Sequence, residues 1–179
     1  MPTVSHRRAR SADVAGIQDV ECDAGRRFID IGMPEIADDP PLATELLTEL
    51  VRNEHVWVSE VDGDQVVAYL IAIEVDDDIH IDQVSVRTEF EGAGIGAALI
   101  DLAATWGRGI GARRATLFTF EGVAWNAPYY RRLGFTSLDD SAMGPELLQI
   151  FDAERATDLQ HWKRVALARP LTHNRVLGA

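Results

Sequence analysis

The chain has 179 residues, of which 46% are hydrophobic and 26% charged, and its formal net charge is −12. These values predict one globular domain over residues 1–179 with a sizeable core. The negative charge disfavours a nucleic-acid partner, because phosphate binding needs a positive face, and mildly favours a cationic substrate. The sequence contains no run of about 18 apolar residues, so no membrane span is expected.

The lone cysteine, Cys22, excludes an internal disulfide, and the basic start of the chain lacks the apolar stretch of a secretion signal. We therefore expect a cytoplasmic protein. The histidines other than His80 are scattered without the spacing of metal ligands, so no metal site is expected. A homodimer is left open.

The apolar pattern of the first half predicts strands and helices joined by loops and a hairpin turn. We expect a short strand at 7–10, a helix from Ser11, a loop or broken helix at 28–41 and a helix at 42–51. Three antiparallel strands follow at 56–61, 66–75 and 79–86, and the run Asp62-Gly63-Asp64 turns the chain between the first two.

The second half alternates helices and strands. We expect helices at 95–108 and 124–133 and one that opens at Pro145, and strands at 115–120, 135–138 and 165–171. Residues 172–179 have little to bury and are expected to fray. The order β-α-α-β-β-β-α-β-α-β-(α)-β predicts a mixed α/β layer fold.

Three alternating glycines, Gly92, Gly94 and Gly96, join a strand directly to a helix. Such a junction points unpaired backbone N–H groups and the positive end of a helix dipole at one spot, which favours phosphate. The run 92–97 also fits the dinucleotide pattern G-x-G-x-x-A. It stands in mid-chain, however, and no acidic residue follows about 20 residues later, which leaves NAD a weak alternative. A tight turn with no ligand is the other alternative.

Two motifs resemble the GNAT superfamily of acetyl-CoA-dependent N-acetyltransferases. The loop Glu91-Gly92-Ala93-Gly94-Ile95-Gly96 resembles the family's acetyl-CoA loop. The run Trp125-Asn126-Ala127-Pro128-Tyr129-Tyr130-Arg131-Arg132-Leu133-Gly134-Phe135 resembles its helix whose tyrosine precedes a Leu-Gly-Phe end. The resemblance covers residues 4–171 and implies a central, mostly antiparallel sheet of six or seven strands flanked by helices.

The loop departs from the family pattern at its start. The family usually has Arg or Gln where Glu91 stands, and often basic residues where Gly92 and Ala93 stand. A carboxylate near a pyrophosphate is expected to weaken binding by roughly 1–2 kcal/mol, the value of one lost charge-assisted contact.

The resemblance also implies the roles of individual residues, with acetyl-CoA as cosubstrate. The residues expected to bind it are Val84, Ser85, Val86, Glu91, Gly92, Ala93, Gly94, Ile95, Gly96, Ala97 and Asn126. Tyr130 corresponds to the tyrosine that protonates the leaving thiolate, with Tyr129 as its competitor, and a phenol is neutral at pH 7 and retains a proton to give. Phe28, Met33 and Trp125 are expected to contact the acceptor.

His80 and Asp82 alternate on one face of the strand that approaches the thioester, and either could relay the proton of the amine. Asp82 is preferred slightly, with His80 as second candidate or partner; the alternative is that both only bind substrate or face solvent.

Together these residues predict transfer of an acetyl group to a primary amine, a small cationic or neutral one, by direct attack in a ternary complex. A catalytically silent acyl-CoA-binding or regulatory module, which Glu91 favours, and a protein N-acetyltransferase are the alternatives.

Overall fold

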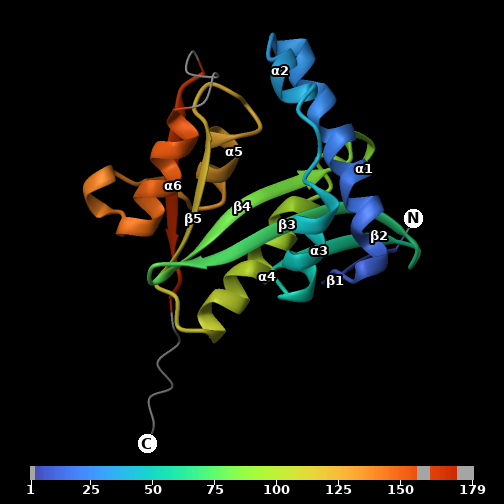
Figure 1. The fold of residues 1–179 in the computed structure, drawn as a ribbon, viewed down its shortest axis with the longest axis horizontal. Helices are drawn as coiled ribbons and strands as arrows, with labels where there is room; N and C mark the ends of the chain where they lie inside the picture. Colours follow the sequence, from blue (N-terminus) through green and yellow to red (C-terminus); the bar gives the residue numbers. More distant parts are fainter. Residues whose placement is uncertain (1–2, 157–161, 173–179) are drawn as a thin grey trace, which may run out of the picture. The chain divides into compact units, whose positions relative to one another are not determined.

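A seven-stranded mixed sheet runs through the computed structural model, which describes residues 3–156 and 162–172, and helices flank the sheet (Figure 1). The strand order is β1-β2-β3-β4-β5-β7-β6. The strands are β1 (Val4–Arg8), β2 (Val56–Val61), β3 (Gln65–Val75), β4 (Asp78–Val86), β5 (Arg114–Phe120), β6 (Thr136–Ser137) and β7 (Arg164–Pro170). Strands β4 and β5 pair in parallel, whereas β1–β2, β2–β3, β5–β7 and β6–β7 pair antiparallel. The predicted fold class is confirmed.

The helices match the predicted order, with shifts at their ends. They are η1 (Ser11–Asp13), α1 (Val14–Gly25), η2 (Arg26–Ile31), α2 (Pro34–Ala37), α3 (Thr44–Arg52), η3 (Thr88–Phe90), α4 (Ile95–Gly109), α5 (Ala127–Arg132), η4 (Asp140–Ala142) and α6 (Pro145–Arg155). Helix α5 begins three residues later than predicted, because Pro128 lacks an N–H and sits in the first turn. None of the described helices combines the length and apolar character that a bilayer crossing requires.

The chain divides into two compact units. Unit 1 comprises Met1–Ala72 and Gln83–Asp101, and unit 2 comprises Ile73–Asp82 and Leu102–Ala179. The expected frayed tail, 172–179, lies outside the described residues from position 173 onward.

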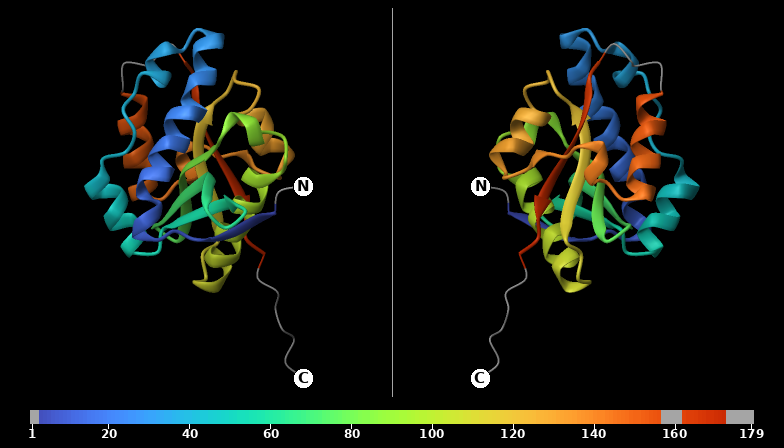
Figure 2. Two further views of the ribbon diagram at one scale, coloured as in Figure 1. Left: turned by 90° about the vertical axis from the view of Figure 1, so that its right-hand side faces the viewer. Right: turned by 90° about the vertical axis from the view of Figure 1, so that its left-hand side faces the viewer.

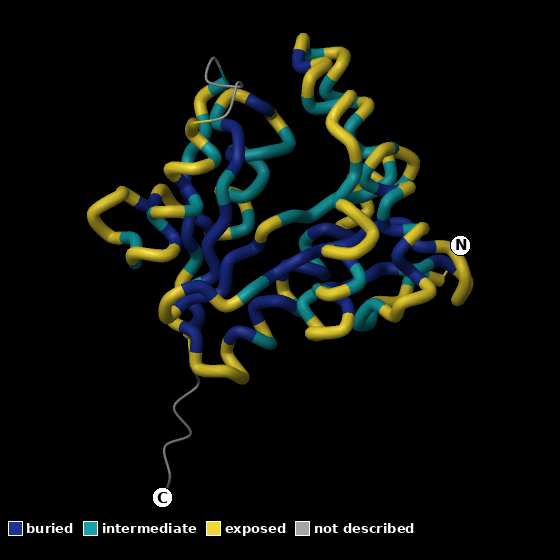
Figure 3. Tube along the Cα trace, in the orientation of Figure 1, coloured by how far each residue is buried: buried dark blue, intermediate teal, exposed yellow. Residues whose placement is uncertain are grey.

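The core of unit 1 lies between its strands and two helices, α1 and α3, which lie side by side in blue and cyan in Figure 2. Its buried residues are Val14, Ile17, Val20, Leu47, Val51, Val56, Val58, Val66, Tyr69 and Ile71. Strand β3 is buried from Val66 to Ala72, as its dark tube in Figure 3 shows. Asp13 ties the start of α1 to β1, because Arg7 donates to both of its carboxylate oxygens at 2.7 and 3.0 Å.

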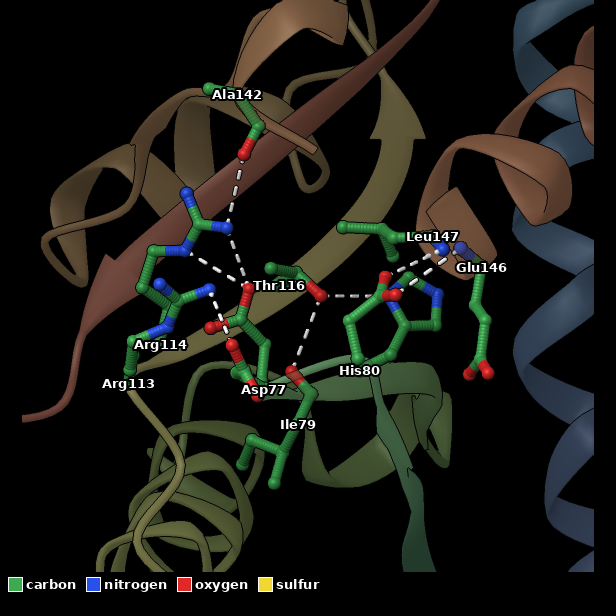
Figure 4. A network of polar contacts seen from close by, with 11 residues as sticks. Asp77, Ile79, His80, Arg113, Arg114, Thr116, Ala142, Glu146 and Leu147 are labelled. Carbon is green, nitrogen blue, oxygen red and sulfur yellow. Dashed lines mark hydrogen bonds and ion pairs between the residues drawn. The ribbon is translucent and has the colours of Figure 1, made fainter. Parts of the chain in front are cut away.

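The core of unit 2 lies under α6. Leu147 and Phe151 of α6 pack with Val75, Leu138, Ala166 and Ala168. The carboxylate of Asp76 accepts hydrogen bonds from the N–H groups of Glu146 and Leu147 at 3.3 and 3.0 Å, which fixes the first turn of α6 (Figure 4). These contacts determine which side chains of α6 face the sheet.

Candidate functional site

The glycine loop of unit 1 is an open turn between η3 and α4. Gly92 and Gly94 have φ angles of 75° and 79°, in the left-handed region that favours glycine. A Cβ added at either position would meet no atom of the described residues within 4 Å. The glycines are therefore required by backbone conformation and not by packing.

The loop ends at the N-terminus of α4, a helix of 15 residues. Its first backbone hydrogen bond there runs from the Ala98 N–H to the Gly94 carbonyl, at 3.1 Å. The N–H groups that precede Ala98 stand at the positive end of the helix dipole, as an anion-binding helix end requires. Just before η3, Val84, Ser85 and Val86 lie half-buried at the end of β4.

Glu91, the residue at which the loop departs from the family pattern, is paired with Arg27. The carboxylate Oε1 lies 2.5 Å from Nη1 of Arg27, the second residue of η2. We expected the Glu91 carboxylate to weaken phosphate binding because its charge was treated as isolated. In the structure, the guanidinium of Arg27 offsets that charge.

In unit 2, His80 is a core residue of β4 and only 1% exposed. Its Nδ1 lies 3.0 Å from Thr116 Oγ1 (Figure 4). The centroid of its ring lies 4.4 Å from that of Phe118. Burial lowers the pKa of His80 from 6.5 to about 4, because the charged imidazolium would lose its hydration. His80 is thus a neutral, enclosed side chain at pH 7.

Asp82, two residues further along β4, is exposed. Its charge acts on Glu154, in the last turn of α6, whose own pKa is raised mainly by burial and further by Asp82, against the opposing effect of Arg164. Arg164 Nη1 lies 2.6 Å from Glu154 Oε2. Glu154 is not among the predicted site residues, although it follows Leu147 and Phe151 at helical spacing and so continues their face toward the sheet.

Tyr130 lies on α5 and packs edge-on against two rings. The centroids of Tyr129 and Phe135 are 5.3 and 5.9 Å from that of Tyr130. Burial, with a smaller contribution from Tyr129, raises the pKa of Tyr130 well above 10, so the phenol keeps its proton at neutral pH. The carbonyl of Asn126 accepts the N–H groups of Tyr129 and Tyr130 at 2.9 and 3.1 Å, and the half-buried Trp125 precedes it.

The two residues expected to contact the acceptor from unit 1 differ in exposure. Phe28 is half-buried, whereas Met33 has no exposed surface. The Met33 N–H donates to the Phe28 carbonyl at 3.0 Å and closes η2. Phe28 is therefore the better placed of the two for contact with a ligand. Among the described residues, no three His, Cys, Asp or Glu side chains are grouped to hold a metal ion.

Comparison with known proteins identifies the same family that the two motifs resemble. A sequence model described as the acetyltransferase (GNAT) family matches residues 23–135. This region includes the glycine loop, Asp82 and Tyr130.

Three solved structures have the same fold at low sequence identity. The ribosomal-protein-S18-alanine N-acetyltransferase from Escherichia coli is 13% identical, with a TM-score of 0.66 over 99% of each chain. The N-acetylglutamate synthase from Neisseria gonorrhoeae, complexed with coenzyme A and N-acetyl-glutamate, is 17% identical, with a TM-score of 0.72 over 97% of this chain and 36% of its own. The PaiA N-acetyltransferase from Thermoplasma acidophilum, in complex with coenzyme A, is 11% identical, with a TM-score of 0.65 over 94% of this chain and 99% of its own.

Proposed function

The chain belongs to the acetyltransferase (GNAT) family, and we propose that it transfers the acetyl group of acetyl-CoA to a primary amine, a small cationic or neutral one. The observation that carries the proposal is the glycine loop. Its two left-handed glycines leave open space where side chains would stand, directly at the N-terminus of α4. A diphosphate needs such close approach to backbone N–H groups.

The glycine loop allows this close approach, so the residues proposed to hold acetyl-CoA fit its diphosphate. In the proposal, the N–H groups of residues 92–97 bind the diphosphate, the backbone of Val84 and Val86 bonds the pantetheine arm, and Asn126 adds a contact. Acetyl-CoA supplies an activated acetyl group as its thioester. The amine nitrogen forms a bond to the thioester carbon while the carbon–sulfur bond breaks, and one proton leaves the nitrogen while one reaches the sulfur.

Asp82 and Tyr130 are proposed to handle these two protons. Asp82 is exposed and, as a carboxylate, accepts the proton that leaves the amine nitrogen, directly or through water. Tyr130 keeps its phenol proton because its pKa is raised, so it has a proton to donate to the leaving sulfur. His80 receives a packing role in this proposal, because it is enclosed and neutral.

The preference for a cationic amine follows from charge. Asp82 and Glu154 place two carboxyl groups near each other, with Arg164 paired to the second. A carboxylate on the acceptor would have to lose its hydration beside Asp82 without a partner, which is costly. Cationic and neutral amines should therefore exceed glutamate and aspartate in kcat/KM, and added salt should reduce the difference.

Thiol release from acetyl-CoA, measured over a panel of amines, tests this function. The panel contains diamines, neutral amines, acidic amino acids and short peptides with free N-termini. Turnover with a small amine supports the proposal, whereas turnover confined to peptides would identify a protein N-acetyltransferase. Tight binding of acetyl-CoA without turnover of any amine would identify the silent binding module.

A further inference from the structure

We propose that Arg27 is the diphosphate-binding cation of this protein, and that Glu91 holds its guanidinium at the loop until the cosubstrate binds. Because this rests on the proposed binding of acetyl-CoA, it assigns to that site a side chain from η2, a segment that neither motif contains. The starting observation is the ion pair of 2.5 Å between Arg27 Nη1 and Glu91 Oε1.

The glycine loop carries no cation of its own. The sequence has no Lys or Arg from Thr88 to Gly107, so neither η3 nor the loop nor the body of α4 supplies one. Arg87 precedes η3, but its Nε donates to the Val66 carbonyl at 3.2 Å, which holds it against β3. Arg27 is therefore the guanidinium that unit 1 brings to the residue immediately before Gly92.

The position of Arg27 is fixed by two further contacts between α1 and the segment that leads to the loop. Glu21 Oε1 accepts a hydrogen bond from Gln83 Nε2 at 3.0 Å, and Asp23 Oδ2 accepts one from the Thr88 N–H at 2.8 Å. With the Arg27–Glu91 pair, these contacts attach the end of α1 and the start of η2 to both β4 and η3. The segment that carries Arg27 is thus held beside the loop by contacts of α1 with β4 and with η3.

The neighbouring arginine shows that this arrangement is specific. The side chain of Arg27 is 26% exposed, whereas that of Arg26 is 75% exposed and lies 3.9 Å from Asp23. Burial lowers the pKa of Arg27 and Glu91 opposes that effect, so the ionised guanidinium is partly desolvated and depends on a negative partner. A diphosphate offers more negative charge than one carboxylate, and its oxygens can accept the two parallel N–H bonds of a planar guanidinium.

When Arg27 changes its partner from Glu91 to the diphosphate, the acceptor side of the enzyme would also be affected. Arg27 is the second residue of η2, and the carbonyl of Phe28, the next residue, accepts the Met33 N–H that closes this segment. A guanidinium bound to the cosubstrate would therefore fix the segment that carries Phe28. We infer that the bound cosubstrate orders the acceptor segment through Arg27.

Titration calorimetry with two probes tests the assignment of Arg27. Coenzyme A carries the diphosphate, and pantetheine lacks it. Arg27→Gln should weaken coenzyme A binding by about tenfold or more, as the loss of one charge-assisted contact predicts, and should leave pantetheine binding unchanged. The matched control, Arg26→Gln, should behave as the wild type with both probes.

The role of Glu91 is tested by Glu91→Gln, with Glu89→Gln as the control on the exposed side of η3. Glu91→Gln should tighten coenzyme A binding several-fold, because the diphosphate no longer competes with a carboxylate for Arg27. Hydrogen exchange gives a readout that is independent of affinity and activity. Coenzyme A should slow exchange over residues 26–33 in the wild type and not in Arg27→Gln.

The outcomes separate this proposal from the proposed function. If the wild type binds coenzyme A and Arg27→Gln binds it equally well, or if Arg27→Gln weakens both probes alike, Arg27 is not the diphosphate cation and the proposal is overturned, while the acetyltransferase function stands. Failure of the wild type to bind coenzyme A at all would overturn the proposed function itself.

Discussion

His80 and Thr116 are joined by a hydrogen bond whose direction the neighbouring backbone sets. The Thr116 hydroxyl donates to the Ile79 carbonyl at 3.2 Å, and His80 Nδ1 lies 3.0 Å from the same Oγ1 (Figure 4). A hydroxyl has one proton, so Oγ1 must accept from His80, and the neutral imidazole carries its proton on Nδ1. This enclosed tautomer is the form that the folded state selects.

The buried His80 predicts a pH dependence of stability. Its pKa of about 4 in the folded state lies below the ordinary histidine value of 6.5, so the unfolded chain binds the extra proton between these values. The free energy of unfolding should fall by about 3 kcal/mol from this residue alone as pH drops from 7 to 4. Urea unfolding from pH 7 to 4 measures it.

The variant His80→Gln keeps an N–H donor toward Thr116 but does not titrate. Its stability should be lower at pH 7 and should lack the fall between pH 6.5 and 4 that the wild type shows. His6→Gln, at an exposed position of β1, is the control. Equal pH slopes in the wild type and His80→Gln would contradict the assignment.

The open glycine loop predicts that one methyl group added at Gly94 weakens coenzyme A binding without preventing folding. Gly94→Ala places a Cβ at φ 79°, which strains the backbone, and in space that the proposal gives to the diphosphate. The variant should fold with a loss of roughly 1 kcal/mol and bind coenzyme A at least tenfold more weakly.

Gly63→Ala provides the matched control, because Gly63 has φ 81° and equally open surroundings in the β2–β3 turn. It should show the same loss of stability with unchanged affinity for coenzyme A. If both variants keep wild-type affinity by calorimetry, the glycine loop does not approach the diphosphate.

Sequence patterns predicted the elements well because local signals fix them. The turn Asp62-Gly63-Asp64 and the strand 56–61 appear as predicted, and the left-handed conformations of Gly92 and Gly94 follow from their place between strand and helix. The pairing of Arg27 with Glu91 could not be predicted in this way. The two residues lie far apart in sequence, and only the docking of α1 against β4 and η3 brings them together.

The candidate base shows a second limit of sequence patterns. His80 and Asp82 share one face of β4 by alternation, as predicted, but the alternation does not tell where the covering helix ends. The ring of Phe118 packs against that of His80 and itself packs against Phe151, whereas Asp82 is exposed and its charge acts on Glu154. The contribution of β5 and α6 to these surroundings could not be predicted from the alternation along β4.

The protonated phenol of Tyr130 predicts a specific kinetic defect. Tyr130→Phe removes one hydroxyl and preserves the ring contacts with Tyr129 and Phe135. Coenzyme A affinity should hold while kcat falls by roughly 10²-fold or more, because the proton is needed only as the thiolate leaves. Tyr129→Phe should retain kcat within a few-fold, and a larger loss there than in Tyr130→Phe would assign the acid to the other tyrosine.

Asp82 and Glu154 together predict the acidic limb of the pH–rate profile. Asp82→Asn should lower kcat/KM most strongly below neutral pH, because the amine then loses its proton acceptor. Burial raises the pKa of Glu154, and repulsion between its negative charge and that of Asp82 raises it further. Glu154→Gln removes that charge, so the acidic limb should move to lower pH while turnover at pH 8 stays near the wild type.

Asp152→Asn, an exposed change on the same helix, should leave the limb in place. A profile that is unchanged in both Asp82→Asn and Glu154→Gln would mean that the amine loses its proton before it binds.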